Sequence, residues 1–221
     1  MITNRIIAFV DGQNLYHAAK KAFGSVYPDY DIKALALSIC KDKSETTGTI
    51  WDLKGIYFYT GVPKASDNQY WNEFWEIKLL NMSRNGIKTF QRPLRYSEKA
   101  TRVSDSEEII AKIGQEKGID VRIAVDVIRM ELNNEYDVAI IFSQDQDLSE
   151  VVSEIHDIAK ETKRWINVAC AYPFSQQSKN KRGINGSDWI QISRIMYKNC
   201  IDPVNYRKII KMKFKQLQLA L

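Results

Sequence analysis

The chain has 221 residues, of which 44% are hydrophobic and 27% are charged, and its formal net charge is +5. These values are typical of a globular protein that forms one α/β domain with an appendage. The longest apolar runs are much shorter than a membrane span, and the N-terminus lacks a secretory signal pattern, so we expect no membrane association. The three cysteines lie far apart and there are only two histidines. We therefore expect a cytoplasmic protein without disulfides or a zinc centre.

Short apolar runs that end at a turn or a polar residue predict strands, at residues 5–10, 53–60, 87–91, 138–142, 165–172 and 188–192. Helical spacing of apolar residues predicts helices between them, at residues 14–23, 31–40, 66–85, 121–132, 148–162 and 195–198. Alternating strands and helices predict a mainly parallel sheet of five to six strands with helices on both faces. Neither a dinucleotide-binding nor a P-loop pattern follows the first strand.

The polar segments between these elements predict loops at residues 41–49, 92–105 and 175–186, and residues 106–113 predict a short helix. The first basic loop contains Arg92 and Arg95, which either contact a polyanionic substrate or are merely solvated. Lys181 and Arg182 lie in a surface loop and would likewise counter the charge of such a substrate.

The C-terminal segment is basic. Residues 203–221 contain five lysine or arginine residues and no acidic residue, so they either dock on phosphates or form the solvated face of a last helix. We divide the chain into a main domain of residues 1–200 and a basic C-terminal helix or tail of residues 201–221. The apolar LQLAL ending packs either on its own domain or on a second subunit, which would give a homodimer.

Aspartates follow two of the predicted strands. Asp11 ends the first strand, and Asp145 and Asp147 follow the strand in DVAIIFSQDQDL, residues 137–148. Because ligand sites of open α/β sheets lie at the carboxyl ends of the strands, these side chains are expected to converge with Asp120, which precedes a helix. Four carboxylates suit a hard cation such as Mg²⁺ or Mn²⁺. Each aspartate also has a structural explanation as a turn, a surface residue or, for Asp120, a helix cap.

Three blocks of the sequence resemble a known family. FVDGQNLY (9–16), EKGIDVRIAVD (116–126) and DVAIIFSQDQDL (137–148) are similar to the signature blocks of NYN domains, which belong to the PIN-like nuclease superfamily. The LabA-like, DUF88-type bacterial branch is the most similar, and the resemblance extends over residues 6–192. It implies a Rossmann-like three-layer α/β/α fold and metal-dependent cleavage of RNA.

The resemblance also implies roles for individual residues. Asp11, Asp120 and Asp145 would be metal ligands, directly or through water, and Asp147 would be a further ligand or would position the attacking water. Asn14 matches the DGxN asparagine, which bonds a ligating carboxylate or a phosphate oxygen, or else caps a helix.

Four further positions in the blocks either match the family pattern or depart from it. Ser143 would orient an aspartate, or simply end a strand. Asp126 matches a family position but lies about 240° around the helix from Asp120, so it can instead pair with Arg122 or Arg129. Lys117 either contacts phosphate or is solvated. Gln144 departs from the usual glycine, which adds bulk and makes a positive φ costly without removing a carboxylate.

The sequence therefore predicts a metal-dependent ribonuclease that cuts single-stranded RNA, with endonucleolytic action expected. The alternative is an RNA- or protein-binding regulator that keeps the fold but has little catalysis, which Gln144 favours. A phosphatase-like hydrolase ranks well behind, because Gln13 stands where a phosphoaspartate mechanism would want a second aspartate.

Overall fold

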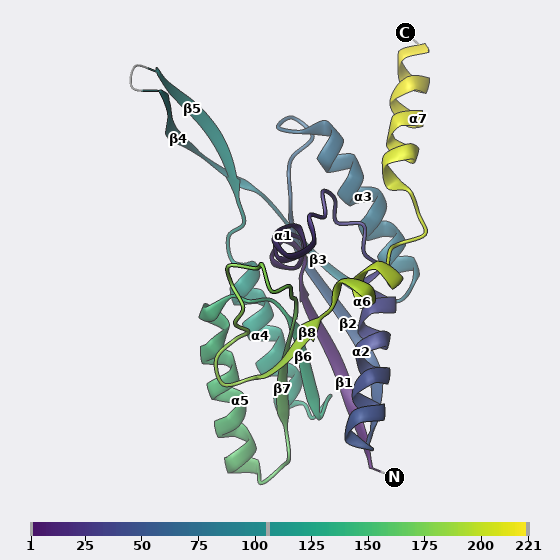
Figure 1. Cartoon of the computed structure of the whole chain (residues 1–221), viewed down its shortest axis with the longest axis vertical. Coiled ribbons are helices and arrows are strands. Elements are labelled where there is room, and N and C mark those ends of the chain that lie inside the picture. The colour runs from purple at the N-terminus through teal and green to yellow at the C-terminus, as the bar shows by residue number, and fades with distance from the viewer. Residues whose placement is uncertain (1, 105–106, 220–221) are drawn as a thin grey trace.

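The computed structural model describes the backbone of residues 2–104 and 107–219, and their side chains except those of 98–104, 107–112 and 217–219 (Figure 1). The strands are β1 (Thr3–Asp11), β2 (Ile50–Val62), β3 (Lys88–Pro93), β4 (Arg95–Ser104), β5 (Glu107–Gln115), β6 (Val138–Phe142), β7 (Asn167–Pro173) and β8 (Asp188–Ile192). The helices are α1 (Gly12–Phe23), α2 (Ile32–Thr47), α3 (Gln69–Arg84), α4 (Ile119–Leu132), α5 (Ser149–Thr162), α6 (Arg194–Asn199) and α7 (Tyr206–Leu219), with a 3₁₀ turn η1 (Gln146–Leu148).

Six strands form one parallel sheet in the order β3-β2-β1-β6-β7-β8. Alternate residues of β1 point to opposite faces, and both sets are buried: Ile6 and Val10 pack with α1, α2 and α3, whereas Ile7 and Phe9 pack with α4 and α5. Strands buried on both faces explain the nearly continuous apolar runs in the sequence. The predicted three-layer α/β/α fold with a parallel sheet is confirmed.

Two predictions about the polar segments are wrong. Residues 92–104 and 107–113 do not form a loop and a short helix: β4 and β5 make an antiparallel hairpin that pairs Arg95 with Gln115 and projects from the sheet (Figure 1). The predictions for residues 105 and 106 lie outside the described residues. The two strands of a hairpin form their backbone hydrogen bonds with each other, so a hairpin can form without the apolar runs that predict buried strands. The predicted loop at 41–49 is mostly helix. The helix α2 continues through this polar, exposed segment to Thr47 and is capped by Gly48, whose φ is +68°.

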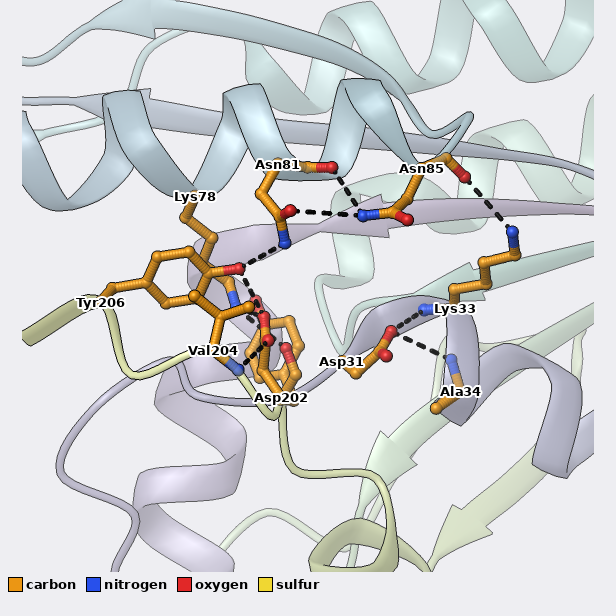
Figure 2. Close-up of polar contacts among 10 residues, drawn as sticks. Asp31, Lys33, Ala34, Lys78, Asn81, Asn85, Asp202, Val204 and Tyr206 are labelled. Carbon is orange, nitrogen blue, oxygen red and sulfur yellow. Dashed lines mark hydrogen bonds and ion pairs between the residues drawn. The ribbon is translucent and has the colours of Figure 1, made fainter. Parts of the chain in front are cut away.

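The segment after α6 is fastened to α3 by buried polar contacts (Figure 2). Nζ of the fully buried Lys78 donates to Oδ2 of Asp202 at 3.1 Å and to the carbonyl of Tyr30 at 2.9 Å. The hydroxyl of Tyr206, the first residue of α7, donates to the same Asp202 oxygen at 2.7 Å. These contacts hold α7 beside α3. The division of the chain at residue 200 and the homodimer stay predictions.

In the described part of the chain, no helix combines the length and the apolar character that crossing a membrane requires.

Candidate functional site

The carboxyl ends of β1 and β6 bring two of the predicted aspartates to one place. The strands are paired in register up to Val10 and Phe142, so Asp11 and Asp145 follow at the same edge of the sheet. Both residues line two cavities, of about 400 Å³ and about 350 Å³. The larger, here the first cavity, also contacts Asn14 and Lys179; the smaller, the second cavity, contacts Lys117 and Asp120.

Hydrogen bonds hold the loops that carry these aspartates. Oδ1 of Asp11 accepts from the backbone N–H of Asn14 at 2.9 Å and so caps α1. Asn14 lies in the first turn of α1, and its Oδ1 in turn accepts from the backbone N–H of Gln144 at 2.9 Å, which joins α1 to the segment after β6. The hydroxyl oxygen of Ser143 accepts from the N–H of Asp145 at 3.1 Å. Asn14 is therefore not the cap of α1 but a link between α1 and the segment after β6.

The position of Asp11 makes its negative charge costly. The residue is only 7% exposed, and its pKa is raised to about 6, chiefly by burial and further by the charges of Asp145 and Asp120. The hydrogen bonds from the backbone of Asn14 and Gln13 act in the opposite direction. A carboxylate held in place under repulsion is a group that a cation would stabilise.

A fifth acidic residue, Glu116, joins the site and was missed from the sequence. It lines both cavities and accepts a hydrogen bond from the backbone N–H of Gly61 at the end of β2. Burial raises its pKa to about 8, with additional contributions from Asp11 and Asp120. A Cβ atom at Gly61 would lie 2.6 Å from Cγ of Glu116, so glycine is needed for this approach. Glu116 opens the EKGID block, but one glutamate after a polar segment carries no other signal.

Asp120 reaches the second cavity in a different way from the one predicted. The helix begins at Ile119, and the capping position is Gly118, whose φ of +74° suits glycine. The predicted cap by Asp120 is therefore wrong, because the N-cap position is Gly118 and Asp120 lies in the first turn of α4. Its carboxylate is left available to the cavity. Lys117 lines the same cavity, and its contact with phosphate stays a prediction.

Two of the aspartates proposed for the site, Asp147 and Asp126, lie apart from both cavities. Asp147 is exposed in η1 and belongs to the lining of neither cavity. Asp126 is only 3% exposed and is bonded on several sides: to Arg122 at 2.8 Å, to Arg129 at 2.9 Å and to the hydroxyl of Tyr59 at 3.0 Å. These bonds fasten α4 to β2, so the contacts of Asp126 are structural.

The predicted basic residues surround the site unequally. The guanidinium of Arg92 lies 5.4 Å from the ring centre of Phe90 and donates to the carbonyl of Lys117 at 3.4 Å, beside the second cavity. Arg95 is exposed at the start of β4, and Lys181 and Arg182 are exposed in the loop after β7. Contacts of these side chains with nucleic acid stay predictions.

Gln144 is accommodated without backbone strain. Among the described residues, the non-glycine positions with positive φ are Asn134 and Lys163, so this chain does not need glycine at 144. The amide of Gln144 donates to the carbonyl of Arg182 at 2.8 Å and braces the basic loop against the site. The bulk of its side chain is thus directed into a contact rather than into strained geometry.

The chemistry of the side chains suits a hard divalent cation, but the ligands are not preassembled. Within residues 2–104 and 107–219, no three Asp, Glu, His or Cys side chains are placed close enough together to hold a metal ion. Four carboxylates nevertheless line the second cavity, and carboxylate oxygens are the ligands that Mg²⁺ and Mn²⁺ prefer. A cation would also relieve the repulsion that raises the pKa of Asp11 and Glu116.

Glu116→Gln is expected to stabilise the protein in alkaline solution. The folded-state pKa of about 8 exceeds the ordinary value of 4.5. Between those values the folded state holds a proton that the unfolded state has released, so wild-type stability falls as pH rises through this window. The glutamine variant lacks that loss.

Thermal unfolding should give similar midpoints near pH ~4.5 and a variant midpoint a few degrees higher near pH ~9, since ~1 kcal/mol shifts the midpoint by ~2–4 °C. The exposed Glu150→Gln is the control; equal midpoints for wild type and Glu116→Gln at high pH would contradict the burial of a charge here.

Comparison with known families identifies the family of this chain. The family model named NYN domain matches residues 5–184. A protein of unknown function from Vibrio parahaemolyticus has a structure similar at a TM-score of 0.49, with 18% sequence identity over 86% of this chain and 94% of that chain. MurG from Acinetobacter baumannii gives a TM-score of 0.30 and 11% identity over 85% of this chain and 45% of its own. No curated protein sequence matches significantly. Because the family model covers most of the sequence and the sheet is parallel throughout, the chain belongs to the NYN domain family of the PIN-like nuclease superfamily.

Proposed function

We propose that this protein is a metal-dependent ribonuclease that hydrolyses phosphodiester bonds of single-stranded RNA at the second cavity, with endonucleolytic action expected. The observation that carries the proposal is the meeting of Asp11, Asp145, Asp120 and Glu116 around that cavity at the carboxyl edge of an NYN-type sheet. Ligands of open α/β sheets bind at this edge. A polyanion is an unsuitable ligand for four carboxylates unless a cation lies between them, which favours metal-assisted chemistry.

Asp11, Asp120 and Asp145 would hold Mg²⁺ or Mn²⁺, with Glu116 beside them. Such an ion, when bound, neutralises phosphate charge and lowers the pKa of a water molecule. Asp11 is held by its bond to the N–H of Asn14, and the backbone of Asp145 is held by Ser143, so both residues are held at the edge of the sheet before substrate arrives. Glu116, which lines the same cavity, would accept a proton from that water as the general base. Lys179 and Lys21 line the first cavity and would face the RNA backbone.

The test is cleavage of labelled single-stranded RNA with Mn²⁺, Mg²⁺ or EDTA by the wild type and by Asp145→Asn. Cleavage by the wild type should require metal, and the variant should be slower by ~10²-fold or more, the loss typical of removing one group that stabilises a transition state. Asp157→Asn, an exposed residue on α5, is the matched control and should cleave normally. Asp147→Asn measures whether that exposed residue belongs to the site. Cleavage that persists in Asp145→Asn would disprove this placement of the site.

A regulator with the same fold is the second candidate, because the carboxylates are not preassembled into a metal site in the described residues. It would bind RNA equally well with metal or EDTA and release no product. That outcome would select binding over catalysis.

A further inference from the structure

A third cavity, lined by aromatic rings, adjoins the first. This aromatic pocket is defined by Tyr16, Trp71, Trp75 and Tyr96 and has a volume of about 260 Å³. Ligand pockets of proteins measure roughly 300–1,000 Å³, so this one suits a small flat group better than a whole nucleotide. Trp75 is buried, whereas Trp71 and Tyr16 are half-buried and leave part of their rings to the pocket.

The aromatic pocket adjoins the first cavity. Gln13 and His17, which lie on the first two turns of α1, line both the aromatic pocket and the first cavity. Gln13 is two residues from Asp11, and its amide donates to the carbonyl of Gly61 at 3.3 Å. Gln13 and His17 of α1 therefore lie between a group in the aromatic pocket and the first cavity.

A basic groove opens on the far side of the same rings. It has a volume of about 550 Å³ and is lined by α7 and by two tyrosines, with the residues Tyr27, Tyr70, Arg207, Lys208, Lys211 and Lys215 central to it. None of the described residues that line it is acidic. The ring of Trp71 lies 5.6 Å from that of Tyr27 and 5.7 Å from that of Tyr70, so these rings form the wall between groove and pocket. Arg207 lies 4.3 Å above the ring of Tyr27.

These three features lie in sequence around the carboxyl edge of the sheet. In Figure 1, α3 and α7 rise side by side above α1, opposite the β4–β5 hairpin. This order suits a single RNA strand. The carboxylates would face the reacting phosphate, the aromatic rings an exposed base, and the clustered cations the further phosphates. Proteins that bind single strands combine a positive groove with aromatic platforms because every base has a stacking face. A paired base would keep its faces within the helix.

We propose that the aromatic pocket binds one unpaired RNA base next to the phosphate at the carboxylates, and that the basic groove of α7 binds the phosphates that follow. This inference rests on the proposed function for the position of the reacting phosphate, but its test is a binding measurement that needs no cleavage. RNA rather than a peptide is favoured because the groove is cationic and the pocket beside it is aromatic.

The first experiment measures binding of labelled single-stranded RNA to the full chain in EDTA by fluorescence anisotropy. Trp71→Ala should weaken binding ~10-fold, the effect expected for one lost base stack, and Trp71→Phe should restore most of it. An RNA scanned with one abasic nucleotide at successive positions should lose a similar factor at one position with the wild type. That position should cost Trp71→Ala nothing more, which a merely unfolded variant would not reproduce. Duplex RNA of the same sequence should bind more weakly.

The second experiment compares two lysines of the same helix. Lys211 lines the groove, whereas Lys213 pairs with Glu73 at 2.6 Å and is not among the groove residues. Lys211→Gln should weaken binding a few-fold and lower the salt dependence by about one phosphate contact, while Lys213→Gln should change neither.

Equal binding by wild type, Trp71→Ala and Lys211→Gln would overturn the inference, as would the absence of a position-specific abasic effect or of any RNA binding. Binding with the expected pattern but no cleavage in Mn²⁺ or Mg²⁺ would refute the proposed nuclease and leave the binding path standing.

Discussion

Asp11→Asn is expected to lower RNA cleavage about 1,000-fold while leaving the protein at least as stable as the wild type. Asp11 is the most confined of the site carboxylates, since it is 7% exposed and lies against the charges of Asp145 and Asp120. Its pKa of about 6 means that, when no cation is present, ionising this carboxyl costs more in the folded chain than in the unfolded chain. Asparagine removes that charge. It also keeps an oxygen that caps α1, because asparagine and aspartate cap helices about equally well.

Activity and unfolding midpoint should be measured together, in EDTA for stability and with Mn²⁺ for cleavage. The sign follows from the raised pKa: above the ordinary value of 3.8 the unfolded state loses its proton first, so wild-type stability declines as pH rises through about 6. The asparagine variant should therefore gain most above that pH. Asp11→Ala is the companion variant and should lose about 1 kcal/mol of capping energy. A fall in stability of Asp11→Asn comparable to that of Asp11→Ala would assign the residue a structural role.

Lys78→Met is expected to destabilise the protein by about 3–5 kcal/mol, as breaking a buried ion pair typically does. Burial lowers the pKa of Lys78, but Asp202 at 3.1 Å opposes that shift and keeps the ion pair (Figure 2). The ammonium group also lies between two rings, 5.3 Å from the centre of Tyr30 and 4.9 Å from that of Tyr206. Removing it leaves Asp202 as an almost buried charge whose remaining partners are the hydroxyl of Tyr206 and the N–H of Val204.

Chemical denaturation of Lys78→Met, Asp202→Asn and the double variant measures this pair. Since the two groups are in contact, the double variant should be more stable than the sum of the single losses predicts, by ~1 kcal/mol or more. Limited trypsin digestion should release α7 from Lys78→Met sooner, because Asp202 and Tyr206 fasten that helix to α3. The exposed pair Lys160–Asp157 is the control, and Lys160→Met should change stability little. An unchanged midpoint for Lys78→Met would show that the cluster contributes no net stability.

The sequence alone indicated the sheet and three of the carboxylates that line the second cavity, Asp11, Asp120 and Asp145. Buried parallel strands are recorded locally, as apolar runs such as residues 138–142, and the ends of those runs place Asp11 and Asp145 at one edge of the sheet. The three blocks added the family, which the family model confirms over residues 5–184. The hairpin of β4 and β5 escaped prediction because its strands pair with each other and do not depend on an apolar core.

Only the tertiary structure decided which other side chains accompany those aspartates. Glu116 enters the site because its segment passes the end of β2, where Gly61 lets its carboxylate approach. Asp147 turns away although it is two residues from Asp145, since η1 rotates it to the surface. Trp71, on α3, meets Tyr27, which follows α1 in the chain, only in the folded protein. Residue spacing specifies the period of a helix or strand, whereas the meeting of side chains from different elements depends on strand order and helix packing, which only the folded chain determines.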